Sequence, residues 1–311
     1  MTRHRLEPTR ETLHGHFSPS LAPVLTIDPG DEVEFRTLDA RWHLERMQSP
    51  GVPGRVFEPK DERLDAGHAL TGPVSVRGAE PGTTLGVEVL SLETGDWGWN
   101  AAGGFDSPVN RALGIVGGER ETLLWDLDAA AGTGTDHLGH TVRLRPFLGV
   151  MGMPPADPGI YSTAPPRRTG GNIDCRELVA GSTLYLPVEV PGGLFSTGDG
   201  HAAQGDGEVS TTAIECPMRS AVLRFSVHPD LPLTTPRATT PAGEVSLGFA
   251  DTLDEAMKIA LTDMVEVMQE RYDVSRREAL ALASVVVDLH VTQVVNGVVG
   301  VHAILPPDAI R

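Results

Sequence analysis

The sequence predicts a mainly β protein, a sandwich or a barrel, followed by a pair of α-helices and a terminal β-hairpin. Segments of alternating polar and apolar residues recur about every ten residues up to residue 250. The 35 Gly and 25 Pro residues occupy turn-like positions without a fixed period, which indicates many short strands. Helical spacing of apolar residues begins only after residue 250. We expect a single domain over residues 1–311, β-rich over 1–250, with the helices and hairpin over 251–305.

The strands of the β-rich part are separated by recognisable turns. The apolar segment 24–27 runs into the turn Asp28-Pro29-Gly30-Asp31, and residues 32–36 then alternate polar and apolar. The other strands expected here cover residues 73–76, 84–90, 183–190, 208–214 and 221–227.

The C-terminal quarter follows a different pattern. Residues 251–272 carry an apolar stripe at helical spacing, and Thr252 with Glu255 matches a capping box. Ser275 with Glu278 repeats this signal ahead of a second helix over 276–287. Two strand-like segments, 289–295 and 298–305, then flank Asn296-Gly297, a dipeptide typical of tight hairpins.

Composition excludes several classes of partner. The formal net charge of −17 repels nucleic acid and anionic membrane surfaces. Two cysteines, Cys175 and Cys216, suit a reducing compartment better than a disulfide framework. No apolar stretch has the length of a signal-peptide core or a membrane span, so we expect a cytoplasmic protein.

Candidate chemistry concentrates between residues 143 and 215. In an extended segment, residues two apart share a side, so Asp199 and His201 are expected to converge across Gly200, and Asn172 and Asp174 to point together. A carboxylate and an imidazole on one spot are ligands for Zn²⁺ or a similar cation. The polar residues of this stretch are Asn172, Asp174, Asp199, His201, Gln204, Asp206, Glu208 and Glu215.

We expect this stretch to supply both metal ligands and catalytic groups. Asp199 and His201 bind the metal, with Asp174 or Glu208 as third ligand and one position open for water. Glu208 is the expected general base, and Asn172 and Gln204 are expected to hydrogen-bond the substrate. The alternative is that 198–201 forms a surface turn in which Asp199 binds only its own backbone.

The same stretch resembles the acetamidase/formamidase family. The resemblance is carried by GGNIDCRELVAGSTLYLPVEVPGGLFSTGDGHAAQGDGEV, RPFLGVMGMPP, TGPVSVRGAEPGTTLGVEVL and DLHVTQVVNGVVGVHAILP, and it runs through nearly the whole chain. It implies a mainly β, sandwich-like fold and hydrolysis of short aliphatic amides such as acetamide and formamide. It also implies a homo-oligomer, a dimer or higher, that depends on a divalent metal, Zn²⁺ first and Ca²⁺ as the alternative. His14 matches a histidine of the family and is a reserve ligand, unless His14 and His16 merely lie on an exposed early strand.

Two other functions remain open from the sequence. A thiol-dependent amidase would use Cys175 as nucleophile, although the neighbouring Asp174 would raise its pKa and strand alternation turns it away from the polar cluster. A non-enzymatic β protein would use the acidic, Gly-rich pocket to bind a metal and a small ligand.

Overall fold

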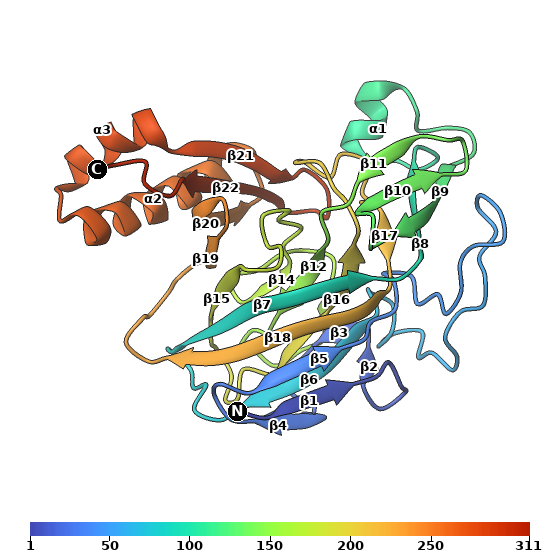
Figure 1. Ribbon diagram of the computed structural model, residues 1–311, viewed down its shortest axis with the longest axis horizontal. Coiled ribbons are helices and arrows are strands. Elements are labelled where there is room, and N and C mark those ends of the chain that lie inside the picture. Colours follow the sequence, from blue (N-terminus) through green and yellow to red (C-terminus); the bar gives the residue numbers. More distant parts are fainter.

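The computed structural model describes residues 1–311 and contains two large β-sheets, a two-stranded sheet and three helices (Figure 1). One large sheet has nine strands, and β1 and β21 form its edges. Its order is β1 (Arg3–Leu6), β5 (Glu32–Phe35), β18 (Met218–His228), β7 (Thr84–Thr94), β15 (Thr183–Pro187), β19 (Arg237–Thr240), β20 (Gly243–Ala250), β22 (Val299–Leu305) and β21 (Asp288–Gln293).

The second large sheet has eleven strands, and its branched end holds the polar residues of interest. Its main path is β11 (Thr141–Arg143), β10 (Thr133–Asp136), β9 (Glu121–Asp128), β8 (Trp97–Ala102), β17 (Glu215–Cys216), β16 (Phe195–His201), β12 (Phe147–Gly152) and β14 (Gly170–Asn172). The branch consists of β6 (Leu70–Val76), which pairs with β16, β2 (Leu13–His14) and β4 (Leu25–Ile27). Outside this sheet, β3 (His16–Phe17) pairs with β13 (Tyr161–Ser162), and α1 spans Pro108–Leu113.

The two large sheets share one hydrophobic core, as a sandwich-like β protein requires. Val87 of β7 and Leu223 of β18 represent the nine-stranded sheet, and Leu148 of β12 and Phe195 of β16 the other; none of the four is more than 1% exposed. Strands β12 and β16 are buried along their whole length, as expected for strands in the interior of the molecule. The mainly β prediction is confirmed, and the packing is that of a sandwich.

The C-terminal helices pack on the far end of the nine-stranded sheet (Figure 1). Helix α2 (Leu253–Tyr272) begins at Thr252, whose side chain accepts from the Glu255 amide, and α3 (Arg276–Val286) begins at a complete Ser275–Glu278 capping box. A separate apolar cluster joins both helices to β22. Figure 1 shows the β21–β22 hairpin running from this helical end toward the middle of the molecule. None of the helices combines the length and apolarity needed to cross a bilayer.

One predicted strand is wrong. Residues 208–214 form an irregular loop instead of a strand. Glu208 and Thr211 have φ values of 45° and 67°, and this left-handed conformation breaks an extended segment. The loop folds back along the chain, since the Thr211 amide donates to the Glu208 carbonyl at 2.9 Å. The polar alternation that resembled a strand therefore marks a loop that contributes Glu208 to the site.

Candidate metal and catalytic site

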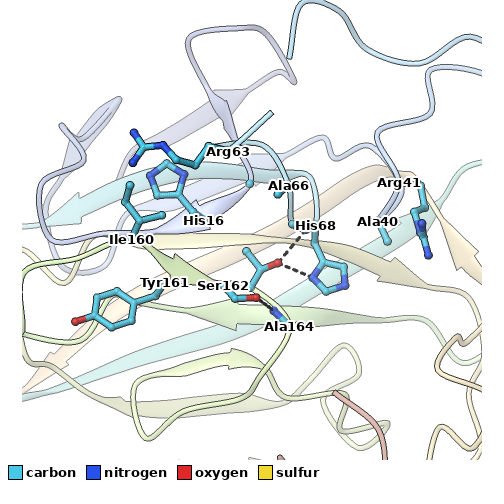
Figure 2. Close-up of a pocket in the computed structure, with 13 residues that line it drawn as sticks. His16, Ala40, Arg41, Arg63, Ala66, His68, Ile160, Tyr161, Ser162 and Ala164 are labelled. Atoms are coloured by element: carbon cyan, nitrogen blue, oxygen red, sulfur yellow. Dashed lines mark hydrogen bonds between the residues drawn. The ribbon is translucent and has the colours of Figure 1, made fainter. Parts of the chain in front are cut away.

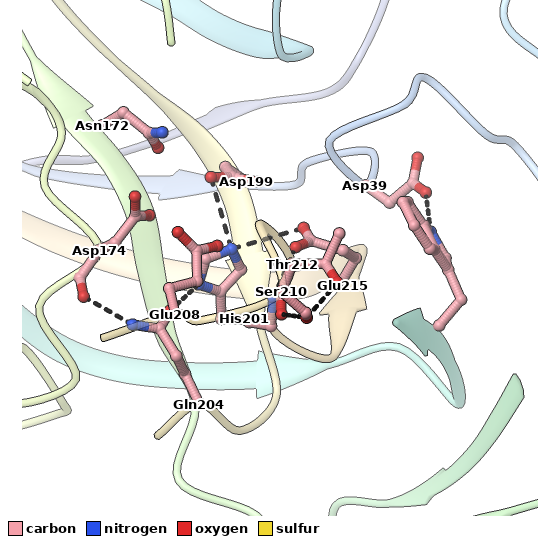
Figure 3. A network of polar contacts seen from close by, with 12 residues as sticks. Asp39, Asn172, Asp174, Asp199, His201, Gln204, Glu208, Ser210, Thr212 and Glu215 are labelled. Carbon is pink, nitrogen blue, oxygen red and sulfur yellow. Dashed lines mark hydrogen bonds and ion pairs between the residues drawn. The ribbon is translucent and has the colours of Figure 1, made fainter. Parts of the chain in front are cut away.

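A buried cluster of carboxylates surrounds the imidazole of His201 at the end of β16 (Figure 3). His201 Nε2 lies 3.4 Å from Asp199 Oδ2 and 3.4 Å from Glu215 Oε2. Pairing of β16 with β17 sets His201 opposite Glu215, which brings in a carboxylate from a different segment. Asp174 and Glu208 form a second candidate ligand set with the same imidazole. None of the five residues is more than 6% exposed, so the charges are shielded from water.

Gly149 of β12 provides the space between these side chains. Its neighbours Leu148 and Val150 pair with Gly200 and Gly198, so Gly149 lies beside Asp199. A Cβ atom at this position would lie 2.5 Å from Asp199 Oδ2, 2.8 Å from His201 Cε1 and 2.9 Å from Asp174 Oδ1. Any side chain here would fill the point on which the ligand atoms converge.

Three residues that contribute carboxylates to the site have a strained backbone conformation. The φ values of Asp174, Asp199 and Glu208 are 53°, 57° and 45°, in the left-handed region that most residues avoid. Such a conformation costs about 1–2 kcal/mol per residue and persists only where the surrounding structure imposes it. Hydrogen bonds fix one of them, because the Gly149 carbonyl accepts from the Ile173 and Asp174 amides at 2.9 and 3.2 Å.

Gln204 orients the central imidazole. Its Oε1 lies 2.9 Å from His201 Nδ1, and its Nε2 donates to the Asp174 carbonyl at 2.8 Å. This contact at Nδ1 directs the other ring nitrogen, Nε2, at Asp199 and Glu215. Metal-binding histidines are held in this way by a partner on the second ring nitrogen.

Several buried polar atoms in the cluster have no hydrogen-bond partner. They are Asp174 Oδ1, His201 Nε2, Glu215 Oε2 and Asn172 Oδ1. Buried polar atoms are rarely left unpaired, because each costs about 1–3 kcal/mol of desolvation. One imidazole nitrogen among carboxylate oxygens is a donor set suited to a divalent cation. The residues present therefore fit a metal.

The ionisation of the cluster leads to the same conclusion. Burial, and then the neighbouring carboxylates, raise the pKa of Asp174 to about 8 and that of Glu215 to about 7, and push the pKa of Glu208 well above its usual value. Against the effect of burial, Glu215 and Asp199 hold the pKa of His201 well above its usual value. A cation removes the repulsion between these carboxylates and stabilises their ionised forms.

The hairpin loop after β21 adds a residue that sequence reasoning used only as a turn marker. Asn296 Nδ2 donates to Asp174 Oδ2 at 3.0 Å and lies 3.5 Å from Glu208 Oε2. Its φ of 67°, followed by 78° at Gly297, is the conformation that makes Asn-Gly a hairpin signal. Asn296 thus forms the turn with its backbone and contacts two site carboxylates with its side chain.

The predicted site residues occupy one region. Asp174, Asp199, His201 and Glu208 converge, while Gln204 has both ends of its amide bonded to protein. Three additions, Glu215, Asn296 and Gly149, lie in the same cluster. Of these, Glu215 belonged to the polar stretch already identified but had no role. The other two carried no sequence signal for a site, because glycine and a turn asparagine are common everywhere.

The remaining predicted residues behave differently. Asn172 donates Nδ2 to the Ala164 carbonyl at 3.0 Å and keeps a buried Oδ1 free. The reserve ligand His14 has both ring nitrogens engaged, by the His16 carbonyl at 2.7 Å and the Ser196 hydroxyl at 3.0 Å. Both His14 and His16 are 6% exposed, so the exposed-strand alternative is wrong.

The cysteine alternative also meets a physical obstacle. Cys175 is fully buried in the main core. Burial raises the pKa of its thiol to about 12, so the thiolate needed for attack is not formed near neutral pH.

A cavity of about 500 Å³ is lined by residues that include His16, His68 and Tyr161 (Figure 2). His68 lines it and stands just before β6, where Leu70 pairs with Gly198, the residue preceding Asp199. The His68 ring is anchored at Nδ1 by the Thr163 hydroxyl at 2.8 Å. Although burial acts in the opposite direction, the histidines His68 and His201 hold the pKa of Asp199 below its usual value. This cavity also contacts Ala164, the hydrogen-bond partner of Asn172.

Comparison with known proteins finds one matching family and several related sequences. The sequence profile of the Acetamidase/Formamidase family matches residues 2–158 and 158–310. The chain is 27% identical to a formamidase of Methylophilus methylotrophus over 248 residues, which cover 64% of this chain and 60% of the relative. It is 26% identical to an acetamidase of Mycolicibacterium smegmatis over 255 residues, 63% of this chain and 61% of the relative. The match thus spans about three fifths of the length of each relative.

A solved structure extends the likeness to the whole fold. The crystal structure of an acetamidase from Bacillus halodurans superposes with a TM-score of 0.83 at 28% identity, covering 97% of each chain.

Proposed function

The chain belongs to the acetamidase/formamidase family, and on that premise we propose that it hydrolyses short aliphatic amides to carboxylate and ammonium with the assistance of a bound divalent cation. The observation that carries the proposal is the convergence of unpartnered buried atoms, Asp174 Oδ1, His201 Nε2 and Glu215 Oε2, around the space at Gly149. The cavity lined by His68 is the proposed path for the amide.

The proposed ligands of the cation are His201 with Asp199, Asp174 and Glu215. The imidazole nitrogen favours Zn²⁺, while the surplus of carboxylate oxygens keeps Ca²⁺ as the alternative. When bound, such a cation polarises the amide carbonyl and acidifies a water molecule. Gln204 is a positioning residue in this scheme, since its amide fixes the His201 ring and does not face the substrate.

Glu208 is the proposed general base and acid. Its carboxylate takes one proton from the attacking water as the carbon–oxygen bond forms, and returns that proton to the nitrogen as the carbon–nitrogen bond breaks. The nitrogen leaves as ammonia, and the proton that remains on the carboxylic acid product passes through solvent to the ammonia, which gives carboxylate and ammonium. The Asn296 amide, 3.5 Å from Glu208 Oε2, steadies the carboxylate in its ionised state. Free Oδ1 of Asn172 is an acceptor for the N–H groups of the amide.

The decisive experiment measures ammonia released from formamide, acetamide and propionamide, with and without a chelator followed by metal add-back. Glu208→Gln is expected to abolish release while leaving bound metal unchanged. Glu93→Gln is the matched control, because Glu93 is an exposed carboxylate paired only with Arg219. Normal turnover in Glu208→Gln would remove Glu208 from the mechanism.

The same experiment separates the alternatives. Retained metal without ammonia from any amide would favour the non-enzymatic binding protein. Release that survives chelation but disappears in Cys175→Ser would restore the thiol mechanism. The proposal also includes a homo-oligomer, a dimer or higher, in the cytoplasm with no nucleic-acid or membrane partner. Light scattering of the purified protein tests the oligomer.

A further inference from the structure

A second group of metal-binding side chains lies outside the site described above. It consists of Asp206 from the loop after β16, His290 of β21 and His302 of β22, whose ligand atoms all lie within 4.8 Å of one another. His290 and His302 are cross-strand partners, and their rings stack with centroids 5.1 Å apart. His290 Nδ1 lies 3.0 Å from Asp206 Oδ2. Three different chain segments therefore meet in a carboxylate–imidazole–imidazole set.

Two atoms of this group are buried without a partner. They are Asp206 Oδ1 and His302 Nε2, and the His302 side chain is fully enclosed. The Thr292 hydroxyl lies 2.8 Å from His302 Nδ1, so a proton donated there leaves Nε2 as a free lone pair. A buried imidazole oriented through its second nitrogen is the usual arrangement of a metal ligand.

We propose that Asp206, His290 and His302 bind a second divalent cation of the Zn²⁺ class, with no ligand shared with the cluster around His201. Two imidazoles and a carboxylate form a three-ligand set that leaves a further position for water. The Asp206 and His290 side chains are 28% and 37% exposed, so a cation reaches the group from solvent. Arg176 is the opposing charge nearby, and its guanidinium is partly balanced by Glu177 at 3.9 Å.

The position of this group indicates what the cation does. The Gly207 amide donates to the Thr292 carbonyl at 3.1 Å, and the Val294 amide donates to the Gly207 carbonyl at 3.0 Å. These bonds join the loop that carries Glu208 to the hairpin that carries Asn296. A cation held by Asp206 and the two histidines would fasten the same junction. Its role is structural, holding two parts of the first site in register.

The test is metal stoichiometry measured on the purified full-length protein after equilibration with Zn²⁺ and removal of free metal. His290→Ala and Asp206→Asn change partly exposed residues, so both variants are expected to fold. Each is expected to hold one equivalent of Zn²⁺ per chain less than the unmodified protein. His140→Ala is the matched control, because His140 pairs with Asp136 at 2.9 Å without a third ligand. This control is expected to retain the full content.

Thermal unfolding of the metal-free proteins gives a second reading. Added Zn²⁺ is expected to raise the Tm of the unmodified protein and of His140→Ala more than that of His290→Ala. Equal Zn²⁺ content in all four proteins would overturn the proposal. The result is separable from the amidase proposal, because an empty first site would lower every content equally and preserve the difference of one equivalent.

Discussion

Gly149→Ala tests whether the space between the site side chains is where the chemistry occurs. The added Cβ would lie 2.5 Å from Asp199 Oδ2 and 2.8 Å from His201 Cε1, whereas ordinary contact begins at 3.4 Å. These atoms must each recede by roughly 0.5–1 Å, and a displacement of that size at a reacting centre costs about 100-fold in rate. The φ of Gly149 is not in the left-handed region, so the backbone itself tolerates alanine.

The expected effect on stability is smaller than the effect on activity. Overpacking of a close-packed interior costs about 1–3 kcal/mol, a fraction of the roughly 5–15 kcal/mol of a folded domain. Ammonia release and bound metal, measured beside urea unfolding, separate the two effects. Gly117→Ala is the control, since a Cβ there meets nothing within 4 Å. A folded Gly149→Ala protein with unchanged turnover and metal content would refute the assignment of this space to the active site.

Three further predictions concern single interactions. Gln204→Leu removes the partner of His201 Nδ1 and is expected to weaken metal binding about 10–100-fold, measured by competition with a chromophoric chelator; unchanged affinity would contradict the orienting role. Arg237→Met removes the two hydrogen bonds of 2.8 Å that the buried Asp263 carboxylate accepts, and it is expected to lower the free energy of unfolding in urea by about 3–5 kcal/mol. The control Arg271→Met changes an exposed arginine and is expected to lower it by less than about 1 kcal/mol. Hydrogen bonds from Arg224 and Arg3 hold the pKa of Glu32 below its usual value, so the ionised carboxylate stabilises the fold at pH values above its unfolded-state pKa. This stabilisation is lost as the pH falls through the pKa of Glu32 in the folded protein. The difference in unfolding free energy between the unmodified protein and Glu32→Gln should therefore shrink in acid, and a difference that does not change with pH would contradict the prediction.

Much of the fold could be predicted because its signals are local. Thr252 and Ser275 cap the two helices through hydrogen bonds that span only three residues. Strand alternation predicts that Asp199 and His201 converge, and the two side chains do lie 3.4 Å apart, although the φ of 57° at Asp199 interrupts the regular strand. Local patterns of this kind fix where elements begin and which side a residue faces, without reference to the rest of the chain.

The strand predicted over 208–214 shows where local pattern fails. Polar and apolar residues alternate in half-buried strands, and they also alternate in loops whose side chains point in turn to a site and to solvent. Glu208 is 6% exposed and Val209 62% exposed, the reverse of what a half-buried strand requires. The left-handed φ of Glu208 is imposed by the surrounding structure, and no sequence pattern encodes it.

The sequence by itself determined the β architecture, the helical pair, and the stretch in which the candidate ligands of the first site concentrate. Only the tertiary structure decided which segments complete that site. The β16–β17 register sets Glu215 opposite His201, and a hairpin about 120 residues beyond Asp174 brings Asn296 to it. The Asp206–His290–His302 group likewise exists only because β21 and β22 pair beside the 205–208 loop. The physical reason is that such contacts depend on sheet pairing between distant segments, whereas periodicity and capping act within a few residues.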